Sequence, residues 1–459
     1  MTAAAARLLL ALSVTATGAF GVVGDSSPRA LALGRSYTAL ARGPEAAFWN
    51  PANLGLGTSP RFKWEMVAAG LGLVAENNAI SVKAYNDHFT DDEHILTDRD
   101  KQDLLAEVPE DGLRFNMDLM PSVAAGLPVN GGIAFPMPWG IHAAVTTGLA
   151  AGVEGELPKD MVDLMFYGNE FDRPYDISDW DGSGWAVASL NWSGARPWLP
   201  PELEPYLGEL SLGLTFKLLG GVYGEVVETS GVLEVLPVGA ELDDLQGLAQ
   251  YGGGLGFGID LGVAGVTRDH RTTFGLGVLN LLDTMTWGIA AQQDSFYAAA
   301  SGLRVTRLLD VENIWDIVDK ADLNGDGVEE HLEKVGERSF SRSLPALVRV
   351  GVARRQTSQL TLLGNYDQAL SEGFGLTTAP RISLGAEYRL VSWFPARSGI
   401  SLGGRSSSTG VGFAFGPFTI GGMELELFDF AYATRGGLVP GSSKGSALSL
   451  AFFRLSLIG

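Results

Sequence analysis

The sequence predicts an all-β protein, folded as an antiparallel β-barrel that crosses a membrane. Three observations predict it: a leader peptide, long runs of alternating apolar and polar residues, and no uninterrupted apolar stretch long enough for a spanning helix. Apolar residues make up 46% of the 459 residues, which excludes a disordered chain. The 61 glycines follow no Gly-X-Y repeat, so they indicate turns, or strand positions without room for a side chain.

The charge balance narrows the classes of partner. The formal net charge is −21 at pH 7, and a surface this acidic repels phosphate backbones, so we expect no nucleic-acid partner. Such a surface suits divalent cations. The chain contains no Cys, which excludes disulfides, zinc–thiolate sites and thiol catalysis.

Residues 1–24 have the features of a secretory signal peptide. Arg7 supplies the positive start, residues 8–14 form a short apolar core, and the small residues 17–19 offer a cleavage site. We therefore expect the mature protein to leave the cytoplasm.

The strands are predicted from a period of two in residues 209–218, 254–263 and 381–390, where every second residue is apolar. Runs of about ten residues are long enough to cross a membrane when tilted. A soluble β-sandwich would give the same alternation, but this series of strands is too long for one sandwich. Aromatic residues near strand ends suit an interfacial girdle; they are Trp287, Tyr366, Trp393, Phe394 and Tyr432.

Two stretches near the N-terminus, residues 32–41 and 45–54, resemble the signature of FadL-type outer-membrane proteins, most of all the PorV/PorQ-like branch. Residues 100–113, 167–170 and 274–287 are similar to an uncharacterised FadL-like group. The resemblance implies a barrel of about 14 strands, with 16 as the alternative, in the outer membrane of a Gram-negative-type bacterium.

The same resemblance implies that residues 25–59 form a plug inside a barrel of residues 60–459. The matching motif residues are Gly34, Asn50, Pro51 and Ala52. Pro51 fixes its own φ and moves Asn50 out of the helical region, which favours a turn from the plug towards the first strand. An ordinary connector would explain the Asn-Pro pair equally well.

The resemblance implies a conduit for hydrophobic small molecules, embedded in outer-membrane lipid. The alternative is a barrel that transports nothing and serves as a scaffold or docking partner for surface or secreted proteins. A soluble periplasmic calcium-binding protein is the third reading. We expect no enzyme: Gly399–Gly403 spells GxSxG, but Ser401 lies in a predicted strand rather than the strand–turn–helix of a nucleophile elbow.

Residues 322–333 match the twelve-residue calcium loop of an EF-hand, inside an expected helix–loop–helix insertion at 306–343. Oxygen ligands fall at the required spacing, with Gly327 at the sharp turn. The expected calcium ligands are Asp322, Asn324, Asp326, the Val328 carbonyl, Glu330 and Glu333. An acidic turn between two amphipathic helices is the alternative. A lone hand would bind with a Kd of about 10⁻⁴–10⁻³ M.

Calcium binding gives the first prediction. Glu333→Gln should abolish calcium-dependent protection of residues 306–343 from protease, because a bidentate carboxylate supplies two ligand oxygens at once. Glu329→Gln is the matched control, since Glu329 occupies loop position 8, which supplies no ligand. The whole protein in detergent is titrated with calcium; no protection at millimolar calcium would leave only an acidic turn.

Overall fold

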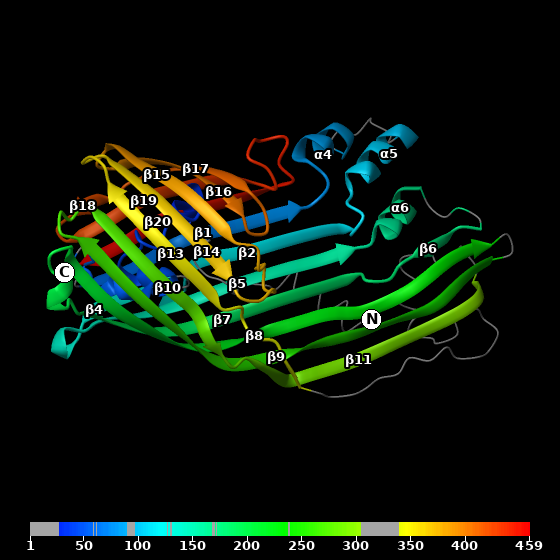
Figure 1. The fold of residues 1–459 in the computed structure, drawn as a ribbon, viewed down its shortest axis with the longest axis horizontal. Helices are drawn as coiled ribbons and strands as arrows, with labels where there is room; N and C mark the ends of the chain where they lie inside the picture. Colours follow the sequence, from blue (N-terminus) through cyan, green and yellow to red (C-terminus); the bar gives the residue numbers. More distant parts are fainter. Residues whose placement is uncertain are drawn as a thin grey trace.

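The computed structural model describes residues 27–459, except 58, 61, 90–96, 126, 129–130, 168–169, 171, 237–238 and 304–338. The fold is a closed antiparallel barrel of 14 strands, as the sequence and the resemblance predict (Figure 1). The ring closes where β1 pairs with β20. Joining the first and last strands avoids an open sheet edge at that position, which lipid would not tolerate because it offers no hydrogen-bond partners.

The strands of the wall are β1 (Lys63–Asn77), β2 (Leu113–Ala125), β4 (Gly131–Pro136), β5 (His142–Leu157), β7 (Asp181–Pro197), β8 (Leu207–Leu236), β9 (Gly239–Thr267), β10 (Thr272–Asp283), β11 (Thr286–Leu303), β13 (Leu347–Arg355), β14 (Leu360–Ala369), β15 (Arg381–Val391), β16 (Phe394–Gly403), β17 (Ser408–Phe415), β18 (Phe418–Ile420), β19 (Met423–Arg435) and β20 (Gly445–Ile458). Three pairs of strands follow one another at a single position in the wall: β2 with β4, β10 with β11, and β17 with β18. The shorter strands are β3 (Leu127–Pro128), β6 (Pro174–Asp176) and β12 (Phe340–Ser341).

Helices lie outside the wall or inside it. Those beside the wall are α4 (Val82–Phe89), α5 (Asp98–Glu107) and α6 (Lys159–Tyr167), and the turns η3 (Pro138–Gly140) and η4 (Pro201–Leu203) join strands. The N-terminal segment, Ser27–Gly57, contains α2 (Pro28–Ala32), η1 (Gly43–Glu45), α3 (Ala46–Trp49) and η2 (Pro51–Gly55). Among the described residues, none of the helices has the length and apolar character needed to cross a membrane.

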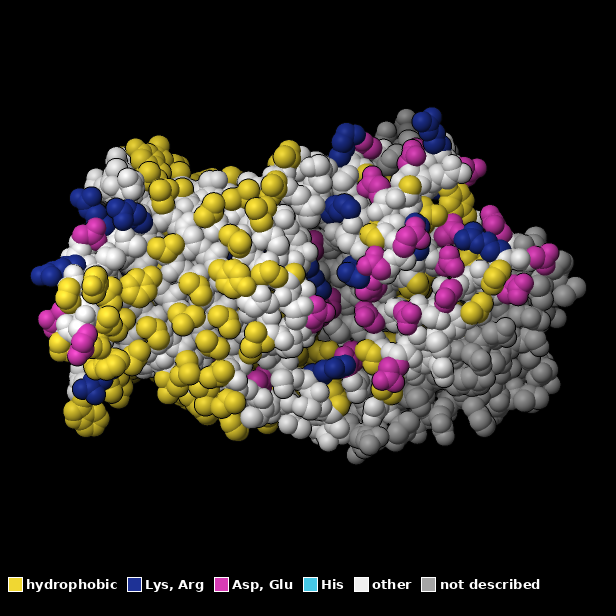
Figure 2. All heavy atoms as spheres, in the orientation of Figure 1, with side chains coloured by type: hydrophobic (Ala, Val, Ile, Leu, Met, Phe, Trp, Pro, Cys, Tyr) yellow, Lys and Arg dark blue, Asp and Glu magenta, His cyan; other side chains and the backbone are white. Residues whose placement is uncertain are grey.

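The alternating residues face the sides that the barrel interpretation predicts. Leu212, Leu214, Phe216 and Leu218 of β8 are exposed on the outside, whereas Thr215 between them is fully buried. Similar rows on the other strands give a broad apolar surface over the left half of the molecule, and charged side chains gather at the right (Figure 2). A soluble sandwich would bury this apolar face, so the alternation reads as lipid-facing.

The two ends of the barrel differ in their connections. Short turns at residues 356–359, 392–393 and 421–422 lie at one end, and longer connections at 78–112, 158–180 and 370–380 lie at the other. Outer-membrane barrels have short periplasmic turns and longer outer loops, so the end with the long loops is the outer end. At that end β8, β9 and β11 continue well beyond their neighbours (Figure 1).

The N-terminal segment lies against the inner wall, and glycines make this approach possible. A Cβ at Gly399 of β16 would lie 2.1 Å from the Leu33 carbonyl carbon, and one at Gly213 of β8 would lie 2.3 Å from the Ala52 nitrogen. The further inward glycines that face this segment are Gly262, Gly275, Gly277, Gly351, Gly385, Gly410 and Gly412. Much of the high glycine content is therefore explained by backbone packed on backbone.

The glycine contacts give the second prediction. Gly399→Val should lower the unfolding temperature and expose Ser27–Gly57 to protease, because overpacking costs about 1–3 kcal/mol when neither backbone can move. Gly364→Val on the outer face of β14 is the control, since its Cβ would make ordinary contacts, the nearest of them a Val352 methyl group at 3.4 Å. Equal unfolding temperatures, followed by heat-modifiable gel migration, would contradict the tight approach.

Candidate functional site

The register of the strands builds a polar layer across the lumen near the outer end. Consecutive cross-strand partners on β1, β2, β5, β7, β8 and β9 form it, and these partners are Glu76, Asn116, Glu154, Ser183, Glu225 and Gln250. Arg405 donates to Asn116 and to Glu154, at 2.6 Å each, and Arg342 donates to Glu225 at 2.8 Å. The layer borders a cavity of about 1210 Å³, called the vestibule here.

At the next inward-facing position of each strand, two residues deeper in the lumen, the partners are mostly apolar, and Asp118 is the exception. The cross-strand partners at this level are Val74, Asp118, Gly152, Trp185, Tyr223 and Gly252. Glycine again provides the space: a Cβ at Gly152 would lie 2.5 Å from the Trp185 ring, and one at Gly254 would lie 2.4 Å from the Trp287 ring. A large aromatic side chain on one strand therefore fits because the facing residue on the neighbouring strand is a glycine, which has no side chain.

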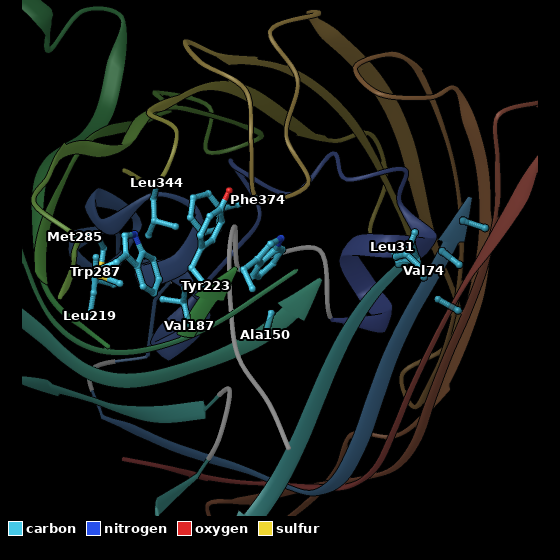
Figure 3. Packing of buried hydrophobic residues seen from close by; sticks show 14 of the residues in the cluster. Leu31, Val74, Ala150, Val187, Leu219, Tyr223, Met285, Trp287, Leu344 and Phe374 are labelled. Atoms are coloured by element: carbon cyan, nitrogen blue, oxygen red, sulfur yellow. The ribbon is translucent and has the colours of Figure 1, made fainter. Parts of the chain in front are cut away.

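Five rings from separate parts of the chain meet at this level and form the aromatic cluster: Trp185, Tyr223, Trp287, Phe340 and Phe374. Ring centroids lie 5.4 Å apart for Tyr223 and Trp287, and 6.4 Å apart for Trp287 and Phe340. Figure 3 shows Trp287, Tyr223 and Phe374 converging inside the ring of strands, with Leu344 beside them. Two of the rings have a hydrogen-bonded polar atom: Tyr223 donates to Glu225 at 2.8 Å, and Trp287 donates to the Arg342 carbonyl at 3.0 Å.

Phe374 reaches the cluster from the loop between β14 and β15, residues 370–380. Its side chain is 5% exposed, although most of the loop around it is exposed. Glu372 accepts hydrogen bonds from the hydroxyls of Thr377 and Thr378, both at 3.1 Å. These hydrogen bonds lower the pKa of the Glu372 carboxyl below its ordinary value, so the bonded, ionised form is stable at neutral pH. The loop is thus fastened to itself.

Deeper in the lumen, buried ion pairs hold the N-terminal segment to the wall. Arg29 makes two hydrogen bonds of 2.8 Å with Glu387 of β15. Arg397 of β16 bridges Glu387 at 3.1 Å and Asp429 of β19 at 2.6 Å. Arg454 of β20 contacts Glu45 of the segment at 3.0 Å. In this low-dielectric interior each charge depends on its partner.

Other charged side chains that point into the lumen form similar ion pairs. The Lys217 amine lies 2.8 Å from the Asp260 carboxylate. Asp367 pairs with both Arg381 and Arg349. The Arg349 guanidinium also stacks on Trp49, 4.2 Å from the centre of the ring. Ser401 lies within β16 and shares a 2.7 Å hydrogen bond with Ser408, so its setting is a strand rather than a nucleophile elbow.

The motif residues near the N-terminus have defined positions. Gly34 has φ +62°, and a Cβ there would lie 2.8 Å from the Ile400 nitrogen, so only glycine fits. Asn50 is extended, as the following proline predicts, and donates to the Val263 carbonyl at 2.9 Å. Pro51 and Ala52 begin η2 and are buried against the inner wall. Whether the segment restricts passage stays a prediction.

Four further expectations have different outcomes. The signal peptide, residues 1–24, and the calcium ligands Asp322, Asn324, Asp326, Val328, Glu330 and Glu333 lie outside the described residues. The insertion expected at 306–343 is too long at its C-terminal end, because Phe340–Ser341 form β12 and pair with β11. Trp287 was expected in the interfacial girdle, and this is wrong, because its side chain is fully buried in the lumen.

The wall is not uniform between β1 and β5. The outer half of β1 pairs with β2, and its inner end, at Lys63–Glu65, pairs with β4. Where β2 ends at Ala125 it turns into β3, and residues 124–125 pair with 127–128 instead of continuing down the wall. One wall position is therefore filled by two strands with an interruption between them.

A family of unknown function, DUF5723, matches residues 224–422, and no curated protein matches the sequence. Among solved structures, the chain is similar to a Pseudomonas aeruginosa FadL homologue, with 13% identity over 94% of this chain and 97% of that one, and a TM-score of 0.46. The Ralstonia pickettii toluene transporter TbuX is 15% identical over 96% of this chain and 98% of that one, with a TM-score of 0.45. The P. putida toluene transporter TodX is 10% identical over 96% of this chain and 99% of that one, with a TM-score of 0.46.

The architecture itself decides the location. A closed antiparallel barrel with an even number of strands, an apolar outer surface and short turns at one end is how a chain spans the bacterial outer membrane. The protein is an outer-membrane β-barrel. The PorV/PorQ-like branch stays an expectation from the N-terminal signature.

The buried ion pairs give the third prediction. Glu387→Gln should destabilise the barrel by about 3–5 kcal/mol and release the N-terminal segment to protease, because Arg29 and Arg397 lose a shared countercharge in a buried site. Glu110→Gln is the control: it breaks an exposed pair with Lys159, which is worth about 0–1 kcal/mol. Chemical unfolding in detergent measures both, and equal stabilities would show that the pairs are not coupled to the segment.

Proposed function

We propose that the protein is an outer-membrane conduit for hydrophobic small molecules. The observation that carries the proposal is the apolar level of the lumen directly beneath the polar vestibule. The lumen of a water-filled porin is polar, so an aromatic cluster across it would hinder hydrophilic solutes and favour apolar ones. The cluster is assembled from four strands and a loop, which makes it a built feature of the lumen.

The route begins in the vestibule, whose paired arginines and carboxylates stay hydrated. An apolar molecule then exchanges water for the aromatic cluster and for the small apolar side chains below it, including Val187 and Ala150 (Figure 3). The N-terminal segment fills the lumen beneath and acts as the plug.

The calcium loop remains part of the proposal as a separate surface feature, supported by its ligand spacing alone. In the described residues the interior favours a conduit over a scaffold, because a docking partner on the cell surface gains nothing from an apolar lumen. The inward-facing charges form structural pairs, which suits a protein without catalytic activity.

The fourth prediction tests the conduit. Intact cells that produce the protein should take up N-phenyl-1-naphthylamine faster than cells with an empty vector, since this apolar dye fluoresces only after it passes the outer leaflet. Val187→Gln should slow uptake roughly five- to a hundredfold, because an amide placed among the apolar side chains below the cluster without a partner costs about 1–3 kcal/mol.

Val187→Ala is the matched control and should retain uptake, because it keeps an apolar side chain at the same position. The amount of folded barrel is equalised by heat-modifiable gel migration. Uptake by the wild-type protein no faster than with the empty vector would reject the conduit and leave the scaffold alternative.

A further inference from the structure

The loop of residues 370–380 divides the lumen in two. The vestibule lies on its outer side, and a smaller cavity of about 70 Å³ lies on its inner side, lined by Trp185, Asp118 and Arg35 among others. The residues that border both cavities are Phe374, Leu376, Thr377, Gly404 and Arg405. Three of them belong to the loop, so the loop is the partition that separates the two spaces.

The Phe374 ring packs between the rings of Trp185 and Tyr223 in the aromatic cluster, and the space between these two rings is called the socket here. The Phe374 ring centroid lies 5.5 Å from that of Trp185 and 5.3 Å from that of Tyr223. No other side chain of the loop is buried to this degree. A phenyl ring between two aromatic walls is the arrangement expected of a bound apolar ligand. Phe374 therefore occupies the place that an incoming ligand would need.

The backbone at the loop tip is strained to place this ring. Gly373, Phe374 and Gly375 have φ values of +117°, +51° and +78°. A bulky residue such as Phe is rarely found with positive φ, and its conformation persists only where surrounding contacts hold it. Here those contacts are the two aromatic rings, so removing them favours a relaxed tip.

The rest of the loop is built to move as one unit. The Gly373–Leu376 bridge closes the tip, and the hydrogen bonds from Thr377 and Thr378 to Glu372 fasten the two arms together. Outside the socket, the loop's flanking residues 370–372 and 378–380 are exposed to solvent. Besides Phe374, Leu376 holds the loop by packing against Leu279, Leu347 and Ala369, and the Thr378 carbonyl accepts a hydrogen bond from Gln368. The tip therefore swings outward only when these contacts break together with those of the Phe374 ring.

We propose that residues 370–380 form a lid over the lumen, kept shut by Phe374 in the socket between Trp185 and Tyr223, and opened when an apolar ligand takes that socket. The inference rests on the proposed conduit function. The lid keeps the apolar level closed to bulk water and joins the vestibule to the inner cavity only when a ligand competes with Phe374.

The test uses the dye-uptake assay with the full-length protein. Phe374→Ala should raise uptake about threefold or more over wild type, because the closed lid loses both ring contacts. Leu370→Ala is the matched control at an exposed position of the same loop and should leave uptake unchanged. Uptake is expressed per folded barrel, so lower assembly of the Phe374→Ala protein does not mimic a closed lid.

A reversible disulfide cross-link between the loop and the barrel wall provides the second measurement. A Cβ at Gly375 would lie 3.9 Å from the Asp118 Cγ, which is the position that a cysteine sulfur at residue 118 would take, so a small shift of the loop towards β2 lets oxidation join two cysteines placed there; the chain has no other cysteine. In the Asp118→Cys/Gly375→Cys protein, oxidation should reduce uptake to the empty-vector level and dithiothreitol should restore it. The two single-cysteine proteins should not respond to oxidation.

The outcomes separate the lid from the conduit. If wild type transports the dye, but Phe374→Ala does not exceed it and the cross-linked protein still transports, the lid is rejected and the conduit stands. If neither wild type nor Phe374→Ala exceeds the empty vector, the conduit itself is rejected. Faster uptake by Phe374→Ala together with a reversible block by the disulfide supports the lid.

Discussion

The contact between the N-terminal backbone and the inner wall is the constraint on which the rest of the lumen depends. A barrel of this size has room for an internal segment only where the wall carries no side chains, and glycines at positions such as Gly213, Gly262 and Gly399 provide that room. Because backbone meets backbone there, the segment has one register against the wall. The buried pairs of Arg29 and Arg454 then fall into place, and the apolar level is left above the segment.

The sequence alone predicts the parts of this fold that depend on a simple period. Alternation on β8 assigns Leu212, Leu214 and Phe216 to lipid because each neighbour on the strand is small or polar, and the structure agrees. The Asn50–Pro51 pair predicts an extended residue and a turn from covalent geometry alone, and both are present. These inferences succeed because they concern residues close together in the chain.

The aromatic cluster could not be predicted in the same way. Trp287 is the second residue of β11, and an aromatic residue so near a strand end favours the interfacial girdle when only the sequence is known. Phe374 lies in a loop without periodicity, and its partners Trp185 and Tyr223 are far away in the chain. The one available signal was glycine opposite tryptophan, at Gly152 and Gly254, and it becomes readable only once the strand pairing is known.

The strands differ in length at the outer end, so the rim of the barrel is higher on one side than on the other. The wall made by β8, β9 and β11 stands well above the wall made by β13 to β17, so the rim is slanted rather than level (Figure 1). The low side is bordered by Glu372, Thr377 and the turn at 404–407, and the high side rises behind Tyr223 and Glu225. In the described residues, the rim is therefore lower on the side of β13 to β17 than on the side of β8, β9 and β11. Under the proposed conduit function, a ligand that moves along the membrane surface reaches the lumen over the lower rim, and the longer strands limit entry from the opposite side.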